Sequence, residues 1–241
     1  MGDATPIPKE PKLEGGSVIY QTIIEELPYL LEGTLVALEL LLAFISLGFI
    51  AGIVLSVMEV YGNTWFSTLA VIIERFFRGV PAVVLLFLFY YGLSDIYNVS
   101  SFVAATFALG LRSGAYQSQI FKGAIQAVGS GQMMAARALG MGELKAIWCI
   151  IIPQALRLAI GPWSNEFASE LKDTSLAYTI GVVELLRRAK YIVSYTYGNA
   201  LVVFGFCAII YLILVRLGNM TLYRFESKLR IPGFEVRRGG R

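Results

Sequence analysis

Three acidic residues lie close together in an otherwise apolar part of the chain. Glu166, Glu170 and Asp173 are spaced by four and by three residues, so on a helix their carboxylates lie along one face. A charged side chain within an apolar helix is costly, and it is usually paired or faces a polar pathway. This face can therefore meet the cationic group of a ligand, or it can form structural ion pairs with Lys172 and with arginines of other helices. Both interpretations fit the spacing.

Two arginines and one amide complete this polar set. Glu74 and Arg78 are four residues apart in the order that favours an ion pair within one helix. Asn165 follows Pro162, which lacks a backbone donor and clashes with the preceding turn, so we expect a local break that frees backbone groups for a polar ligand. The residues that we expect to line a polar pathway are Arg78, Arg112, Asn165, Glu166, Glu170 and Asp173.

The chain lacks the patterns that most catalytic sites need. It contains no histidine, and its two cysteines, Cys149 and Cys207, stand far apart without metal-ligand or redox spacing. The phosphate-binding pattern G-x-x-x-x-G-K-[ST] is missing, as is any Gly-Lys pair. We therefore expect no enzyme activity, no cofactor and no metal in this chain. The net charge of +3 does not indicate nucleic acid, because most basic residues flank apolar stretches.

The composition places the chain in a lipid bilayer. Hydrophobic residues make up 56% and charged residues 15% of the chain, which is too apolar for an ordinary soluble domain. At about 1.5 Å per residue, the stretch 33–57 is long enough to cross a hydrocarbon core of about 30 Å. Similar stretches predict spans at 67–92, 99–121, 159–183 and 199–223. The expected fold class is therefore all-α, a polytopic membrane protein with about five transmembrane helices.

The two ends of the chain differ from this membrane domain in composition. Residues 17–31 have the pattern of an amphipathic helix that lies in the membrane interface. We therefore divide the chain into an N-terminal polar segment with this interfacial helix (1–32), a transmembrane domain (33–223) and a basic tail (224–241). Basic residues concentrate in the tail and in the loop near 122–152, so both should be cytoplasmic and the N-terminus outside. The cluster from Arg187 to Lys190 goes against this orientation.

The predicted cytoplasmic loop carries the segment AARALGMGELKAIWCIIIPQALR, residues 135–157. Its alanines favour a short helix, Gly140 can adopt a left-handed cap, and Gly142 lets the chain turn. A surface helix with small side chains allows a partner to approach closely. A plain surface connector fits the same pattern.

Two G-x-x-x-G spacings occur in the predicted spans, at 48–52 and 110–114. Such spacings permit close contact between helices in lipid. They indicate packing within the chain more than a dimer seam.

Long segments of the chain, in order, resemble the membrane subunits of ABC importers for polar amino acids. The similar segments are LLEGTLVALELLLAFISLGFIAGIVLS, FFRGVPAVVLLFLFYYGL, GAYQSQIFKGAIQAV, AARALGMGELKAIWCIIIPQALRLAIGPWSNEF and LKDTSLAYTIGVVEL. In that family the loop carries a glutamate-alanine-alanine motif followed by a glycine. The resemblance implies the type I ABC importer permease fold, with a cytoplasmic coupling helix in the loop, in the cytoplasmic membrane of a prokaryote.

The resemblance also implies partners. The permease would form a homodimer or a heterodimer, and an extracytoplasmic solute-binding protein would supply a polar amino acid. ATP and Mg would be bound by separate ABC ATP-binding subunits, which would grip the loop helix. The residues expected at that docking site are Ala135, Ala136, Leu139, Gly140, Met141 and Gly142.

At four positions the chain departs from the family pattern. Met134 replaces the motif glutamate, Gln119 stands where many relatives have glutamate, and Gly129 stands where many have proline. Glu170 is an extra acid where relatives are often apolar, which favours arginine or lysine as the substrate over glutamine.

Two alternatives of other classes remain open on the sequence. An ion-coupled secondary amino acid transporter usually shows repeated halves with helices broken at matching places, and of its features only the acids within the membrane are present. A non-transporting membrane scaffold would bind partners without flux.

Overall fold

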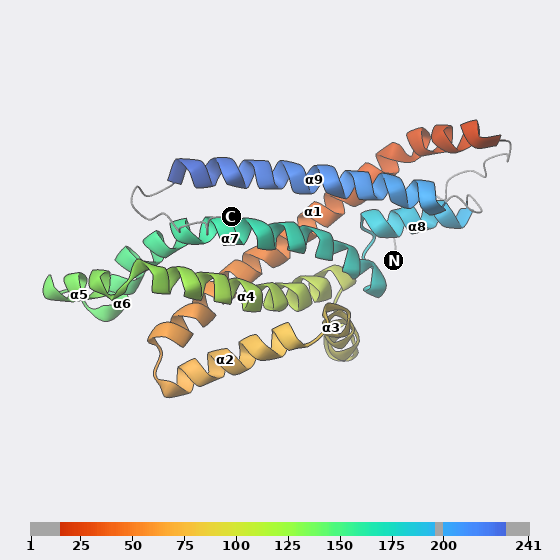
Figure 1. Ribbon diagram of the computed structural model, residues 1–241. Coiled ribbons are helices and arrows are strands. Elements are labelled where there is room, and N and C mark those ends of the chain that lie inside the picture. The colour runs from red at the N-terminus through yellow and green to blue at the C-terminus, as the bar shows by residue number, and fades with distance from the viewer. Residues whose placement is uncertain (1–14, 196–199, 230–241) are drawn as a thin grey trace.

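The computed structural model describes residues 15–195 and 200–229, and all the regular elements in that part of the chain are helical (Figure 1). This confirms the all-α expectation. The polar N-terminal stretch 1–14 and the tail from residue 230 lie outside the described residues, so the parts of the domain division that fall there stay predictions.

Helix α1 (Gly15–Tyr61) is one continuous helix through Pro28. The sequence predicted two elements here, an interfacial helix over 17–31 and a span over 33–57, but the backbone does not separate them. Residues beyond Pro28 pack at once on other parts of the protein, since Leu30 lies in a buried cluster with Leu185 and Ile192. This packing outweighs the local cost of a proline inside a helix. Whether the first turns lie in the membrane interface stays a prediction.

The predicted span 67–92 consists of two helices, α2 (Thr64–Gly79) and α3 (Ala82–Tyr97). They are separated at Val80, whose φ of −87° and ψ of 132° are extended. The ring of Pro81 disfavours the helical conformation for the preceding residue, and Val80 is extended, so the prediction of a single helix over 67–92 was wrong. Figure 1 shows the consequence, because α3 is seen end-on beside the end of α2.

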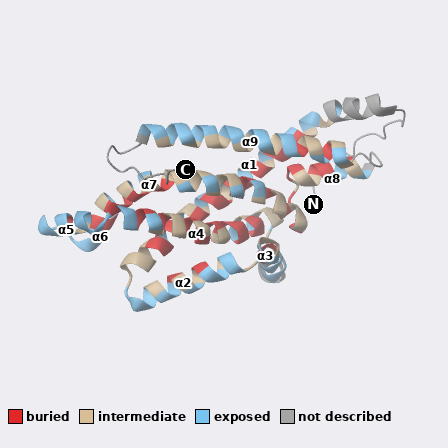
Figure 2. Ribbon diagram, in the orientation of Figure 1, coloured by how far each residue is buried: buried red, intermediate tan, exposed pale blue. Residues whose placement is uncertain are grey.

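Helix α4 (Ser101–Val128) lies between α1, α2, α3 and α7 (Figures 1 and 2). Its two spaced glycines face α1: a Cβ on Gly110 would lie 2.7 Å from the Leu47 side chain, and one on Gly114 would lie 2.8 Å from the Ala51 Cβ. This confirms the expectation that the G-x-x-x-G spacings serve packing within the chain.

The loop between the third and fourth predicted spans contains α5 (Ser130–Ala138), α6 (Glu143–Ala146) and one π-helical turn (Ile147–Ile151). Helix α7 (Ile152–Asp173) follows and continues as a 3₁₀ helix (Thr174–Ile180). The expected break at Pro162 is absent, because α7 runs through it. The flanking Ala159 and Leu171 are both buried in core clusters, and this packing holds the helix in spite of the missing backbone bond.

The chain ends in α8 (Leu185–Tyr195) and α9 (Ala200–Leu229). Within the described residues, three segments are long and apolar enough to cross a membrane: Glu25–Tyr61, Glu143–Ile180 and Ala200–Lys228. Helix α4 carries polar side chains that are buried against its neighbours, among them Ser113, Gln117 and Ser118, so its composition is less apolar than its buried position suggests. The number of five spans stays a prediction.

Candidate functional site

A row of polar side chains, partly buried between the helices, connects α2, α4 and α7. Arg112 on α4 donates from Nη1 to Oδ2 of Asp173 on α7 at 2.7 Å. The two residues are 61 positions apart. Structural pairing was one of the two roles that the sequence left open for the acidic face, and Asp173 has it.

The row continues to α2 through an aromatic ring. The guanidinium carbons of Arg78 and Arg112 lie 5.2 Å and 4.9 Å from the ring centroid of Tyr116, within the range of cation–π attraction. Arg78 is in turn paired with the buried Glu74, which confirms the predicted pair within one helix. We call these five residues, Glu74, Arg78, Tyr116, Arg112 and Asp173, the polar row.

Glu170 differs from the other acids because it is buried without compensation. Only 2% of the residue is exposed. In the described part of the chain neither carboxylate oxygen makes a hydrogen bond of normal geometry, and the one polar side chain that interacts with it as a donor is the hydroxyl of Ser113 on α4. Glu166 is half-buried one turn earlier and interacts electrostatically with Arg112, Asp173 and Arg78. A buried carboxylate is stable only when it is paired or protonated. Glu170 therefore either holds a proton or needs a cationic partner, which makes it the candidate contact for a cation beside the polar row.

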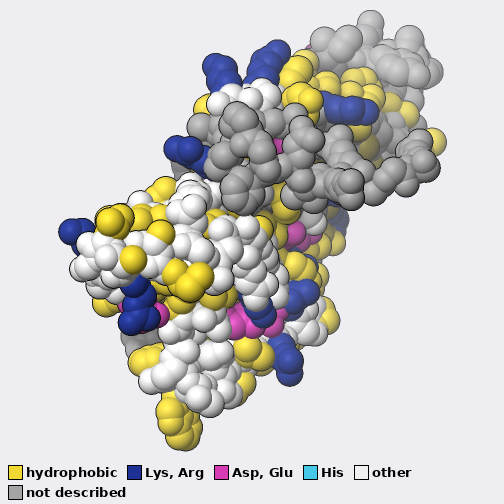
Figure 3. Space-filling model, turned by 60° about the vertical axis from the view of Figure 1, so that its left-hand side comes forward, with side chains coloured by type: hydrophobic (Ala, Val, Ile, Leu, Met, Phe, Trp, Pro, Cys, Tyr) yellow, Lys and Arg dark blue, Asp and Glu magenta, His cyan; other side chains and the backbone are white. Residues whose placement is uncertain are grey.

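The remaining candidates point elsewhere. Asn165 is exposed, and Lys172 is exposed as well, since it is two residues from Glu170 and so lies on another side of α7. Lys172 is therefore not the partner of the buried carboxylate. In Figure 3 the acidic side chains of the visible face gather in a few places next to Lys and Arg side chains.

Sequence reasoning missed a buried amide beside this site. Gln117 is fully buried and donates from Nε2 to Ser113 Oγ at 2.7 Å, while Trp163 Nε1 donates to its Oε1 at 2.8 Å. The same nitrogen also lies 3.4 Å from the carbonyl oxygen of Ile45. The amide thus joins α1, α4 and α7. The available signal was a polar residue one turn after Ser113, on the glycine-containing side of the helix.

The loop presents most of the expected docking residues to the outside. Leu139 is 82% exposed, and Ala135, Gly140 and Gly142 are exposed too, with Met141 half-buried. Ala136 is only 1% exposed, so it supports the helix from inside and does not face a partner. Met134, which stands at the position of the motif glutamate, is 65% exposed. The exposed surface around the end of α5 is thus mixed, with the apolar Met134 and Leu139 beside the charged Arg137.

A left-handed cap ends α5 as the sequence predicted. Gly140 has a φ of +79°. The backbone N–H of Met141 donates to Ala136 O at 3.1 Å, and that of Gly140 donates to Arg137 O at 3.0 Å. This is the bonding pattern of a Schellman motif. The cap fixes the direction in which the chain leaves the exposed helix.

The two arginines of the basic cluster that opposed the predicted orientation are held by contacts within the protein. Arg188 is buried, and its Nη1 donates to Glu32 Oε2 at 2.6 Å and to Tyr29 O at 2.9 Å. Arg187 donates to Tyr178 O at 2.9 Å. Because these arginines are held by α1 and by the preceding segment, they carry less information about membrane orientation than free surface charges do.

Glu184 caps α8 from a fully buried position. It lies beyond the candidate span that ends at Ile180, and burial raises the pKa of its carboxyl to about 7. Its oxygens accept hydrogen bonds from the backbone N–H groups of Leu186 and Arg187, both at 2.8 Å, and from the Tyr211 hydroxyl at 3.2 Å. These three donors offset part of the cost of burying the group.

Comparisons with known proteins agree with one another. Residues 45–230 match the family model of the binding-protein-dependent transport system inner membrane component. The chain is 35% identical over 197 residues to the histidine/lysine/arginine/ornithine transport system permease protein HisM of Salmonella typhimurium, covering 77% of this chain and 83% of the relative. It is 40% identical over 191 residues to the nopaline transport system permease protein NocM of Agrobacterium fabrum, covering 74% and 78%. The glutamine transport system permease protein GlnP of Escherichia coli is 30% identical over 217 residues, covering 88% and 98%.

Solved structures give the same fold. A crystal structure of an amino acid ABC transporter with histidines matches with a TM-score of 0.77 and 31% identity, covering 86% of this chain and 97% of that one. An inward-facing structure of the MetNI methionine ABC transporter matches with a TM-score of 0.74 and 19% identity, covering 84% and 97%. At that low identity the second match supports the fold alone.

Proposed function

The chain belongs to the family of binding-protein-dependent transport system inner membrane components, as a membrane permease subunit of the amino acid ABC importers, and on that premise we propose that its substrate is a cationic amino acid. Membership in this family favours ATP-driven import over an ion-coupled carrier and over a scaffold without flux.

The single observation that carries the substrate proposal is that the carboxylate of Glu170 is buried and, among the described residues, forms no ion pair. Glu166 lies one turn away, and the nearest arginine, Arg112, is already bonded to Asp173. A guanidinium or ammonium group that reached Glu170 would remove the cost of the unpaired charge, whereas the neutral amide of glutamine would remove less of it. The relatives HisM and NocM are named for transport of basic amino acids and of nopaline, and GlnP for glutamine.

We place the source of energy outside this chain. ATP and Mg would be bound by separate ATP-binding subunits, and the exposed side of α5 with Leu139 and the Gly140 cap would seat in their surface. A solute-binding protein on the outside would deliver the amino acid, and a second permease copy or a related permease would complete the pathway. The loop and the tail would then be cytoplasmic and the N-terminus outside, in the orientation that the basic residues predict.

The experiment is reconstitution of the complete transporter in liposomes with its ATP-binding subunit and its binding protein. We expect uptake of labelled arginine or lysine that requires ATP inside the vesicles and does not respond to ion gradients. Uptake that persists without ATP and collapses when ion gradients are removed would contradict the proposal. Preference for glutamine over both basic amino acids would overturn the substrate assignment alone.

Replacing Glu170 by glutamine in this assay should lower arginine uptake by about 10- to 100-fold, because a hydrogen bond to a charged group is worth about 1.5–3 kcal/mol. Thermal stability should stay the same or rise, since an uncompensated buried charge is removed. Glu226→Gln makes the same chemical change in the last two turns of α9 and should leave uptake unchanged. If E170Q transports arginine as well as the parent chain does, Glu170 is structural.

A further inference from the structure

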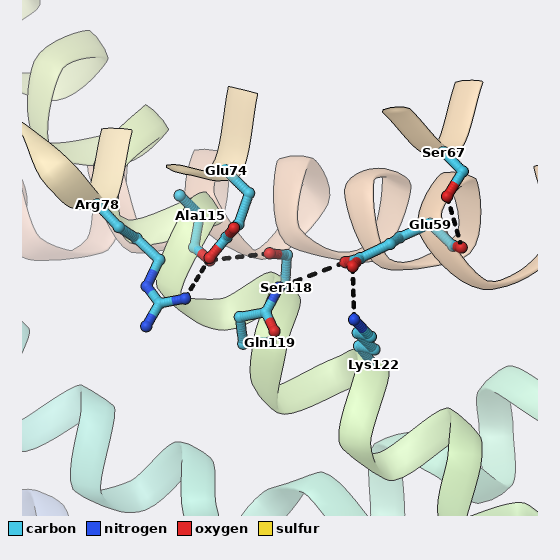
Figure 4. Close-up of polar contacts among 8 residues, drawn as sticks. All are labelled: Glu59, Ser67, Glu74, Arg78, Ala115, Ser118, Gln119 and Lys122. Carbon is cyan, nitrogen blue, oxygen red and sulfur yellow. Dashed lines mark hydrogen bonds and ion pairs between the residues drawn. The ribbon is translucent and has the colours of Figure 1, made fainter. Parts of the chain in front are cut away.

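Glu59 lies where α1, α2 and α4 meet, outside the polar row (Figure 4). Its carboxylate bonds two side chains of α4: Lys122 Nζ lies 2.5 Å from Oε1, and Gln119 Nε2 donates to Oε2 at 3.3 Å. Its backbone carbonyl accepts a hydrogen bond from Ser67 Oγ at the start of α2, at 3.2 Å. One residue therefore joins three helices. We call Glu59, Lys122 and Gln119 the clasp.

Helix geometry gives no local reason for an acid at this position. Glu59 lies in the last turn of α1, which ends at Tyr61, and the negative end of the helix dipole disfavours an acid there. The Glu59 side chain is only 12% exposed and that of Lys122 is 29% exposed, so water screens the charge weakly. The favourable energy must come from the bonds across to α4. Gln119 is neutral and donates only a hydrogen bond to the carboxylate, so Glu59 alone balances the charge of Lys122.

The clasp is close to the part of the protein that supports the docking loop. Phe121, Ile125 and Val128, on the same last turns of α4, lie in the buried cluster that also contains Ile147 and Ile151 of the π-helical turn. Val57, Val60 and Tyr61 of α1, on either side of Glu59, pack against that same cluster. A displacement of the loop therefore pushes on the ends of both helices.

We propose that the clasp is a positioning element that makes α1 and α4 move as one body when the ATP-binding subunits displace the docking loop. The packing of the cluster transmits the push, and the ion pair prevents the two helix ends from sliding past each other. The clasp touches neither substrate nor ATP. The inference rests on the proposed function, because it needs a loop that is moved by a partner.

The test compares Glu59→Gln, Lys122→Gln and the exchange E59K/K122E in the reconstituted complete transporter. The quantity measured is the amount of amino acid taken up per ATP hydrolysed. Each single variant should keep ATP hydrolysis but lose at least about 5-fold in uptake per ATP, the lower end of typical coupling between sites. The exchange restores opposite charges, and Gln119 can turn its amide oxygen toward the new ammonium group, so it should recover most of the loss. Glu39→Gln, the same change at an exposed position of α1, serves as the control and should match the parent chain.

Thermal stability measured on the same proteins separates positioning from plain stabilisation. If the single variants melt earlier but keep the parent ratio of uptake to ATP hydrolysed, the clasp only stabilises the fold and the inference is wrong. It is also wrong if the exchange couples no better than the single variants. A parent complex without ATP-driven uptake overturns the proposed function, and the inference with it, whereas an active parent with unaffected variants overturns the inference alone.

Discussion

Replacing Gly114 by leucine is expected to prevent α4 from packing on α1, while the same replacement at Gly123 on the same helix is expected to be tolerated. A Cβ at Gly114 would lie 2.8 Å from the Cβ of Ala51 and 3.2 Å from the backbone oxygen of Gly48. Both atoms are fixed to the backbone of α1, so no side-chain rotation relieves the clash. At Gly123 nothing lies within 4 Å of the added carbon.

The expected size of the effect follows from the difference between the two sites. Both changes gain about 1 kcal/mol in helix propensity, but overpacking at Gly114 costs about 1–3 kcal/mol or more. For a leucine side chain placed against a backbone atom, we expect a cost at the upper end of that range. In detergent, the thermal midpoint of Gly114→Leu should therefore fall by about 5 °C or more, or the protein should not accumulate. Gly123→Leu should melt at the parent temperature or above it. Equal midpoints would show that α1 and α4 are not held together through these glycines.

This contrast explains why some contacts could be predicted from the sequence. The two glycine spacings and the pair Glu74–Arg78 are local patterns, with both partners within one turn of one helix, and the structure confirms them. The acidic face on α7 was also visible, because helical periodicity alone places its members together. Such local patterns can be predicted because the geometry of a single helix fixes the positions of their members relative to one another.

Contacts between distant segments have no such signature. Glu59 and Lys122 are 63 positions apart, and no local pattern in either segment points to the other residue. Gln117 likewise receives its bond from Trp163, 46 positions away. Their pairing depends on how α1, α4 and α7 are placed in space, and the periodicity of the sequence does not specify that placement.

Pro81 and Pro162 show that the effect of a proline on a helix depends on how the surrounding residues are packed. Pro81 ends α2, because Val80 takes the extended conformation that a following proline favours. Pro162 lies inside α7 without ending it, since buried residues on both sides hold the helix in place. The prediction of a break was therefore wrong at Pro162, and the prediction of one unbroken helix was wrong at Pro81. A sequence pattern without the packing could not distinguish them.

We expect the backbone conformation of Gly140, and not a side-chain contact, to determine whether the loop can dock. Its φ of +79° lies in the left-handed region, which costs a residue with a Cβ about 1–2 kcal/mol, and a β-branched residue is at the upper end. Nothing lies within 4 Å of the carbon that a side chain would add. The cost of Gly140→Val is therefore conformational strain and not a clash with neighbours. This strain weakens the hydrogen bonds of the Schellman motif, which set the direction in which the chain leaves α5.

If the ATP-binding subunits recognise α5 in this geometry, the strain should appear as weaker association. About 2 kcal/mol corresponds to a roughly 30-fold higher Kd for the immobilised ATP-binding subunit, with a matching loss of ATP-driven uptake. Gly131→Val is the matched control, because Gly131 lies on the same helix, is exposed, and has no atom near its added carbon. The control should bind as the parent chain does. Equal affinities for the two variants would mean that the partner grips a part of the protein that does not depend on the Gly140 cap.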